Sequence, residues 1–269
     1  MDSAGDRRIL LRRDERPQGA VVATVTVNTP QKLNAMNGAL MDALAGVFCE
    51  LGADAQLRAV VLTGAGAKSF IAGADINEMA ALKNTAEATA FITRLHHACD
   101  AIRNCPVPVV ARIQGYAFGA GLEIAAACDV RIAADTASFG MQEVKLGIPS
   151  VIEAALLPTL VGFGRAREIM YLGETFGSAD ALAWGLVEHV VPAATLDAKI
   201  EDWIGKLLTS APGAVRLQKQ LIRQWEDLPL TAAIEAGIGA FAASYGSDEP
   251  RATMAKFLAA RQARKKDAS

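Results

Sequence analysis

The chain has 269 residues, a length that fits one large α/β domain or a main domain with a helical appendage. With 52% apolar residues, 21% charged residues and a formal net charge of −2, the composition is that of a globular protein and argues against long disordered tracts. The charge gives no basis for nonspecific binding to nucleic acid or to anionic lipid, so we expect neither partner.

The sequence predicts a cytoplasmic location. Its N-terminus lacks an apolar stretch long enough for a signal peptide, and no run approaches the ~20 apolar residues that cross a bilayer. The four cysteines form no CxxC pair, and each stands among mostly apolar neighbours. We therefore expect them to be reduced and buried, as thiols of cytosolic proteins usually are.

Strands and helices alternate in the first half of the sequence. Residues 9–13 and 20–27 predict a β-hairpin, and apolar residues at helical spacing predict a helix over 37–51 with Asn37 as its N-cap. Next come a strand over 58–63, a helix over 85–103, a strand over 109–113, a loop over 115–121, a short buried helix over 122–128 and a strand over 129–133. This order predicts parallel strands joined by right-handed crossovers.

Helices dominate the second half of the sequence. We expect them over residues 150–160, 164–172, 178–184, 195–209, 211–225, 230–245 and 248–264, with one strand signal over 186–191. The pattern predicts an α/β core over residues 1–195 and a C-terminal helical region over residues 196–269.

Three motifs that would indicate other chemistry fail on spacing. LTGAGAKS follows a strand, but its glycines do not have the spacing of a P-loop. Gly115, Gly119 and Gly121 do not fit the GxGxxG pattern of a dinucleotide site. His96 and His97 are adjacent on a helix, so their side chains diverge and a metal site is not expected.

Two small-residue loops and two glutamates stand together in the sequence. Residues 71–75 and 115–121 each follow a strand and lack bulky side chains, so a ligand can approach their backbone N–H groups. Glu123 follows the second loop, and Glu143 lies one strand further on, both in apolar settings. Convergent N–H groups can form an oxyanion hole worth ~3–4 kcal/mol per donor, and buried carboxylates can move protons. The combination suits chemistry that passes through an enolate.

A structural role for either glutamate is an open alternative. Glu123 could stabilise its helix through the N-terminal dipole, and Glu143 could pair with Lys145 or Arg131. The glycines and alanines of the loops could simply permit close packing.

Several segments resemble the crotonase family of enoyl-CoA hydratases and isomerases. They are IAGADINEM, IQGYAFGAGLEIAAACDVRIAADTASFGMQE and LGETFGSADALAWGLVEHVVP, and the likeness runs from VATVTVNTPQKLNAMNGAL to SDEPRATMAKFLAAR. The resemblance implies an α/β fold, the crotonase spiral of ββα units. It also implies a C-terminal helical region that supports a homotrimer or a homohexamer of two stacked trimers.

The resemblance implies an acyl-CoA substrate and assigns roles to the two loops and the two glutamates. The N–H groups of Ala74 and Ala120 would hold the thioester oxygen. Glu123 would help to hold and deprotonate the attacking water, and Glu143 would exchange a proton between water and the α-carbon.

Further positions match those that shape the coenzyme A and acyl pocket of the family. They are Lys32, Leu33, Ala35, Ile71, Ala72, Asp75, Ile76, Gly119 and Phe257. Lys32 would lie near the nucleotide phosphates, and Phe257 on the adenine side, from a neighbouring subunit. An ordinary exposed lysine is the alternative for Lys32.

Isomerases of the family typically keep one catalytic acid, so two glutamates favour an enoyl-CoA hydratase. Such an enzyme is a hydro-lyase of fatty acid β-oxidation that needs no metal and no cofactor beyond the coenzyme A of its substrate. Isomerisation, thioester hydrolysis or C–C cleavage of another acyl-CoA, or a noncatalytic binding role, stays open as an alternative.

One segment departs from the family pattern. Residues 147–158 read GIPSVIEAALLP, where typical hydratases carry a glycine-rich stretch that is one residue longer. Val151, Ile152 or Glu153 could narrow the pocket, reposition water or supply a further acid. Glu153 could equally be a charge that favours a helix N-terminus.

Overall fold

The computed structural model describes residues 8–267, and the chain divides into two compact units, Met1–Ile204 and Gly205–Ser269. The division falls inside helix α7 (Leu196–Leu208), somewhat later than the boundary expected after residue 195. The first turns of α7 belong to the first unit because Leu196 and Ile200 are buried and Asp197 pairs with Arg112 of the sheet at 2.5 Å.

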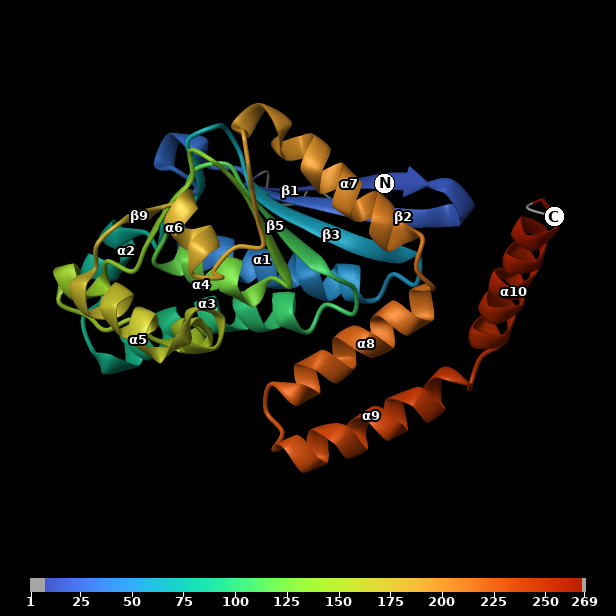
Figure 1. The fold of residues 1–269 in the computed structure, drawn as a ribbon. Coiled ribbons are helices and arrows are strands. Elements are labelled where there is room, and N and C mark those ends of the chain that lie inside the picture. Colours follow the sequence, from blue (N-terminus) through green and yellow to red (C-terminus); the bar gives the residue numbers. More distant parts are fainter. Residues whose placement is uncertain (1–7, 268–269) are drawn as a thin grey trace. The chain divides into compact units, whose positions relative to one another are not determined.

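Residues 8–204 form two sheets (Figure 1). The larger has the order β1-β2-β3-β5-β7-β10, with β1 (Ile9–Arg16), β2 (Ala20–Val27), β3 (Leu57–Gly64), β5 (Val109–Ile113), β7 (Val130–Ala134) and β10 (His189–Val191). The smaller has the order β4-β6-β8-β9, with β4 (Ser69–Ile71), β6 (Tyr116–Phe118), β8 (Ser138–Gly140) and β9 (Phe176–Gly177). β1 and β2 form the expected antiparallel hairpin, and β2, β3, β5, β7 and β10 run parallel as expected.

From β3 to β8, consecutive strands alternate between the two sheets, and each pair of strands is followed by a helical segment. β3 and β4 precede α2 (Ile76–Ala80) and α3 (Thr85–Arg103), β5 and β6 precede α4 (Ala120–Ala127), and β7 and β8 precede the 3₁₀ helices η3 (Glu143–Leu146) and η4 (Ile152–Leu156) and helix α5 (Leu157–Leu172). This repetition is the spiral of ββα units that the resemblance implies.

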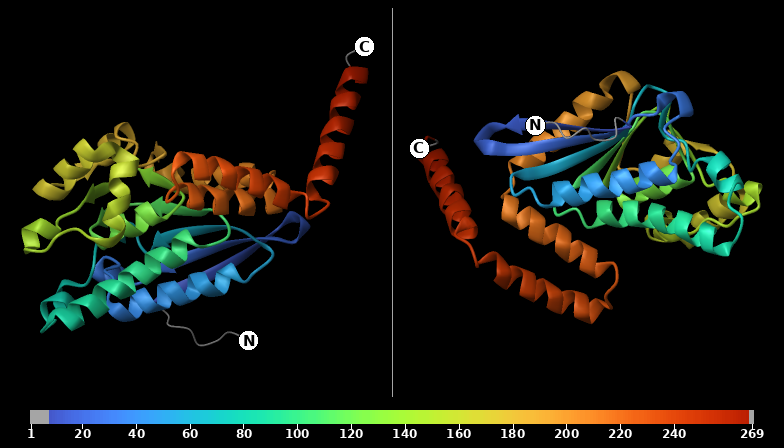
Figure 2. Two further views of the ribbon diagram at one scale, coloured as in Figure 1. Left: turned by 90° about the horizontal axis from the view of Figure 1, so that it is seen from below. Right: turned by 180° about the vertical axis from the view of Figure 1, so that it is seen from behind.

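Helices α1 (Gly38–Gly52) and α3 lie side by side on one face of the larger sheet (Figure 2). Asn37 caps α1 as expected, because its side chain accepts a hydrogen bond of 2.9 Å from the N–H of Leu40. Asn84 caps α3 in the same way through the N–H of Glu87, also at 2.9 Å. Each helix therefore begins after a residue that satisfies one of its free N–H groups, and the two expected helices are confirmed.

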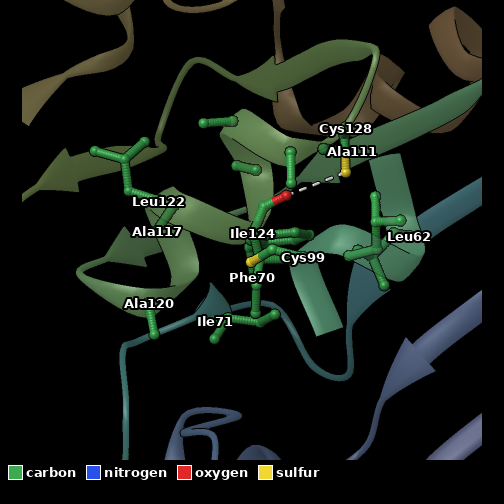
Figure 3. Close-up of a cluster of buried hydrophobic side chains, with 14 of the residues drawn as sticks. Leu62, Phe70, Ile71, Cys99, Ala111, Ala117, Ala120, Leu122, Ile124 and Cys128 are labelled. Atoms are coloured by element: carbon green, nitrogen blue, oxygen red, sulfur yellow. Dashed lines mark hydrogen bonds between the residues drawn. The ribbon is translucent and has the colours of Figure 1, made fainter. Parts of the chain in front are cut away.

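Helix α4 passes through the centre of the core, and every residue from Ala120 to Ala127 is buried. Figure 3 shows its side chains packed with Ile71 at one end and with Cys99 of α3. The helix consists mostly of alanine and glycine because its neighbours approach so closely. A Cβ atom on Gly121 would lie 1.9 Å from the carbonyl oxygen of Ile71.

Three local expectations are wrong. The loop expected over residues 115–121 contains strand β6, whose partners β4 and β8 are distant in sequence. The helix expected over residues 150–160 begins as the 3₁₀ helix η4, and α5 is kinked at Gly162, where φ is 77°. Cys49 is exposed, whereas Cys99, Cys105 and Cys128 are buried as expected, and the described residues contain no disulfide.

The remaining elements complete both units. The first unit also holds η1 (Pro17–Gly19), η2 (Pro30–Lys32), α6 (Ser178–Ala183) and η5 (Ala193–Thr195), and the second holds α8 (Pro212–Trp225), α9 (Leu230–Ser244) and α10 (Glu249–Asp267). In the second unit, α8 and α9 pack together and Trp225 Nε1 donates to the carbonyl oxygen of Ala233 at 2.8 Å. Among residues 8–267, no helix combines the length and hydropathy that crossing a membrane requires.

Candidate active site

Three neighbouring strands of the smaller sheet bring the candidate residues together. β4, β6 and β8 run parallel and are adjacent, so their carboxyl ends meet at one edge. Ala72 to Ala74 follow β4, Gly119 and Ala120 follow β6, and Glu143 comes shortly after β8. Ligand sites commonly form where the carboxyl ends of parallel strands meet, because loops from several strands converge there.

A pocket with a volume of about 120 Å³ opens at this edge. Its lining contains seven of the residues predicted from the sequence: Ala72, Ala74, Ile76, Gly119, Ala120, Glu123 and Glu143. The rest of the lining is mostly apolar, so the pocket suits a hydrocarbon chain with a few polar groups at one end.

The backbone around Ala74 pairs with Met36 and leaves the N–H group of Ala74 out of that pairing. Met36 pairs with this loop, because its N–H donates to Gly73 at 2.9 Å and its carbonyl accepts from Asp75 at 2.9 Å. Successive N–H groups of an extended chain alternate in direction, so the N–H of Ala74 points away from this pairing. Gly73 adopts a φ of 116°, which an L-residue rarely does and which shapes the turn.

Ala120 supplies the second N–H group. It is the first residue of α4, where N–H groups have no acceptor within the helix. Gly119 before it has a φ of 49° and turns the chain from β6 into the helix. Ala74 and Ala120 thus contribute backbone donors to one pocket, which is the arrangement that an oxyanion hole requires.

The segment around Leu33 supports the loop after β4 from outside the pocket. The carbonyl of Leu33 accepts from the N–H of Ala72 at 3.1 Å, and the buried side chain of Asn34 donates to the carbonyl of Ser69 at 3.0 Å. Leu33, Ala35, Ile71 and Asp75 are not among the residues that line the pocket. Their part in binding coenzyme A stays a prediction.

Two of the predicted residues for coenzyme A lie on exposed surface. The side chain of Lys32 is 61% exposed, and its Nζ lies 3.5 Å from Oδ2 of Asp75, just outside the loop. Phe257 lies on α10 in the second unit and is 68% exposed. Its role at the adenine stays a prediction.

Glu123 occupies the first turn of α4, and its residue is only 4% exposed. Burial raises the pKa of this carboxyl to about 8, and the neighbouring charges of Glu143 and then Glu153 act in the same direction, against the N–H of Ala154. The helix dipole also favours an acid at this position. The dipole does not explain why the side chain reaches the pocket, so a purely structural role fits Glu123 poorly.

Glu143 lines the same pocket as Glu123. Its Oε2 accepts a hydrogen bond of 3.0 Å from the hydroxyl of Ser150, and partial burial raises its pKa from the ordinary value. Its Oε1 packs against Gly119, where a Cβ atom would lie 2.4 Å away. A side chain at position 119 would therefore displace the carboxylate of Glu143.

The ion pairs considered for Glu143 are not formed. Lys145 Nζ lies 2.6 Å from Glu174 Oε1 instead. The guanidinium of Arg131 binds Glu188 at 2.5 Å. Glu143 is therefore a carboxylate without a cation partner in the described residues, as proton-transfer chemistry would use it.

Sequence reasoning missed the apolar wall that α3 contributes. Phe91, Ile92 and Leu95 line the pocket together with Met79, Leu146 and Ile148. Phe91 and Leu95 stand four residues apart, so they share one face of the helix. This spacing could have indicated a buried face, but the pattern alone does not separate a pocket wall from ordinary core.

Residues 147–158, the segment that departs from the family pattern in the sequence, contribute to the site in two ways. Pro149 and Val151 line the pocket, whereas Glu153 lies behind it, 4% exposed, with its Oε1 at 2.9 Å from Nδ1 of His96. Within residues 8–267, no group of histidine, cysteine and acidic side chains could hold a metal ion.

Comparisons with known proteins give a consistent result. The sequence profile of one family, Enoyl-CoA hydratase/isomerase, matches residues 17–268. The chain is 36% identical over 242 residues to the short-chain-enoyl-CoA hydratase of Clostridium acetobutylicum, a match that covers 90% of this chain and 92% of that protein. It is 34% identical over 213 residues to the carnitinyl-CoA dehydratase of Escherichia coli, covering 79% and 80%. The crystal structure of an enoyl-CoA hydratase of Mycobacterium smegmatis matches with a TM-score of 0.89 at 31% identity, covering 94% of this chain and 96% of that one.

Proposed function

Since the chain belongs to the enoyl-CoA hydratase/isomerase family, also called the crotonase family, we propose that it adds water reversibly across the 2,3 double bond of an enoyl-CoA thioester. The acyl chain occupies the apolar pocket, and the thioester oxygen accepts hydrogen bonds from the N–H groups of Ala74 and Ala120. These donors stabilise the negative charge that this oxygen gains when water attacks.

The two glutamates share the proton chemistry unequally. Glu123 is the more deeply buried, and its pKa of about 8 keeps it protonated at neutral pH when the pocket is empty. Glu143 is less buried, and the hydroxyl of Ser150 stabilises its charged form. Environments that separate the pKa values of two acids define which acts as base. Glu143 is therefore the base, and Glu123 holds the water through its protonated carboxyl. This division differs from the one that the resemblance implies, in which Glu123 also helps to deprotonate the water.

The reaction returns both glutamates to their starting protonation states. The water oxygen bonds to C3 while Glu143 takes one proton from the water, and the C2–C3 electron pair moves toward the thioester oxygen to give an enolate. The enolate returns this electron pair to C2, which takes the proton from Glu143. Neither a metal ion nor a redox cofactor enters this sequence, and the coenzyme A belongs to the substrate.

One observation carries the proposal above the others: two glutamates that pair with no cation among the described residues line the pocket that also contains Ala74 and Ala120. Isomerisation of a double bond is the second candidate, because Pro149 and Val151 replace a glycine-rich stretch near Glu143 and could exclude the water. Isomerisation needs only one acid, which makes it the weaker candidate.

A spectrophotometric assay separates the two reactions. A hydratase removes the absorbance of the conjugated thioester when it is given short- or medium-chain 2-enoyl-CoA esters. Protein that binds these esters but leaves the conjugated bond intact, while it converts a 3-enoyl-CoA ester, would instead be an isomerase.

The pH profile of kcat/KM should be bell-shaped, because the active form needs Glu143 ionised and Glu123 protonated. Activity should fall as pH rises past about 8, where Glu123 loses its proton. It should also fall on the acid side, at a pH above the ordinary range for glutamate, where Glu143 gains a proton. Initial rates from about pH 5 to about pH 10 measure both limbs. A profile that is flat through pH 8 would contradict the role of Glu123.

Other properties implied by the resemblance stay predictions. They are assembly as a homotrimer or homohexamer, a cytoplasmic location, a place in fatty acid β-oxidation, and contacts of Lys32 and Phe257 with coenzyme A. Exposure of Lys32 beside the loop after β4 is compatible with contact to a phosphate group.

A further inference from the structure

A third carboxylate, Glu153, is buried behind the pocket and has no part in the mechanism above. It lies in η4, it is 4% exposed, and it does not line the pocket. Its Oε2 is inaccessible to solvent and has no hydrogen-bond partner among the described residues. Burial of a carboxylate oxygen without a partner is costly, so a role for this side chain is expected.

Helix α3 holds Glu153 from one side. Nδ1 of His96 lies 2.9 Å from Oε1, and the rest of the imidazole reaches solvent. Cys99 stands one turn further along the same helix face. Burial, followed by the charges of Glu153 and Glu123, raises the pKa of the Cys99 thiol well above its ordinary value. The 3₁₀ helix η4 packs directly on α4 and on α3, which brings Glu153 into the neighbourhood of Glu123.

The backbone of η4 fixes Glu153 in this position from the other side. Ile152 directly before it has a φ of 42°, a strained left-handed conformation that a β-branched residue rarely adopts. The N–H of Ala154 directly after it faces the carboxyl of Glu123. A strained residue and a backbone donor therefore flank Glu153 and hold it between His96 and Glu123.

We propose that Glu153 is a positioning residue: its carboxylate, fixed by His96, keeps the shared proton of the glutamate pair on Glu123 and leaves Glu143 free to act as base. Its catalytic meaning rests on the proposed function. The titratable groups around Glu123 are Glu143 from η3, Glu153 from η4 and the thiol of Cys99 from α3. The thiol stays neutral, so the two carboxylates supply the negative charge that opposes ionisation of Glu123.

The test is a carbon-13 NMR titration of the empty protein, labelled at the side-chain carboxyl of glutamate. The signal of Glu123 is assigned by its loss in Glu123→Gln and should titrate at about pH 8 in the wild type. In Glu153→Gln the midpoint should move to lower pH, because one negative charge beside Glu123 is gone. Glu168→Gln is the matched control, since it removes the same charge from an exposed pair with Arg165 and should leave the midpoint unchanged.

The activity profile gives a second readout that a merely structural role would not move. In Glu153→Gln the alkaline limb of kcat/KM should move to lower pH together with the NMR midpoint. At a pH above the limb, activity should then fall about tenfold for each pH unit by which the midpoint has moved. Glu153→Leu should move the midpoint of Glu123 in the same direction. Leucine has no polar atom that burial would leave without a partner.

The proposal is overturned if the Glu123 midpoint in these variants equals that of Glu168→Gln or rises. Wild-type protein that does not hydrate enoyl-CoA esters would overturn the proposed function alone, because the NMR midpoint does not depend on turnover.

Discussion

Replacing Glu143 with glutamine should lower kcat for hydration of a 2-enoyl-CoA ester by about 10²–10⁴-fold. The amide cannot take a proton from water, although it has nearly the same shape as the carboxyl. Its oxygen can still accept from Ser150, whose hydroxyl lies 3.0 Å from the carboxylate. We therefore expect the free energy of unfolding to change by less than about 1 kcal/mol. Steady-state kinetics and thermal unfolding of one preparation measure the two effects.

Companion variants show whether the two glutamates act on the same water. Glu123→Gln should lower kcat by at least about tenfold, because an amide donates a weaker hydrogen bond to the water than the protonated carboxyl does. The double variant should be about as slow as Glu143→Gln alone, since groups that act as a unit are not additive. The exposed control Glu168→Gln should keep its kcat. A Glu143→Gln variant with wild-type kcat would remove Glu143 from the mechanism.

Gly121→Ala should destabilise the protein by about 3 kcal/mol, the largest stability effect that we expect near the site. The new Cβ would lie 1.9 Å from the carbonyl oxygen of Ile71, a backbone atom that cannot rotate away. The start of α4 would have to move, and with it the N–H of Ala120 and the carboxyl of Glu123. The midpoint of thermal unfolding should fall by about 6–12 °C for a chain of this length.

Gly46→Ala is the matched control for this substitution. Gly46 also lies inside a helix, α1, but a Cβ there meets no atom within 4 Å. The same change should therefore raise the stability by about 0.5–1 kcal/mol, because alanine favours a helix. If Gly121→Ala were as stable as Gly46→Ala, the close packing of α4 on β4 would be wrong.

Long elements with clear end signals could be predicted from the sequence. Helices α1 and α3 have apolar residues at helical spacing, and an asparagine that precedes each supplies its cap. The parallel strands of the larger sheet are buried apolar runs between helices, which is the pattern that identified them. Strand β6 was missed because three residues carry little periodicity, and its partners β4 and β8 come from distant parts of the chain.

The polar part of the site could be predicted more fully than its apolar part. Ala74, Ala120, Glu123 and Glu143 were identified in motifs, and all of them line the pocket. The wall that includes Phe91 was not, because an apolar side chain on a helix face has the same pattern in a pocket and in a core. The pair of His96 and Glu153 was missed for another reason, since these residues are 57 positions apart and only the fold brings them together.

The most direct test of the account is to turn over a 2-enoyl-CoA ester in water enriched in oxygen-18 and to analyse the product by mass spectrometry. Hydration predicts a 3-hydroxyacyl-CoA that carries one oxygen-18 atom, formed by the wild type and lost in Glu143→Gln. Substrate that is consumed without uptake of oxygen-18, or a product that is only a shifted double bond, would contradict the proposal that this pocket adds water.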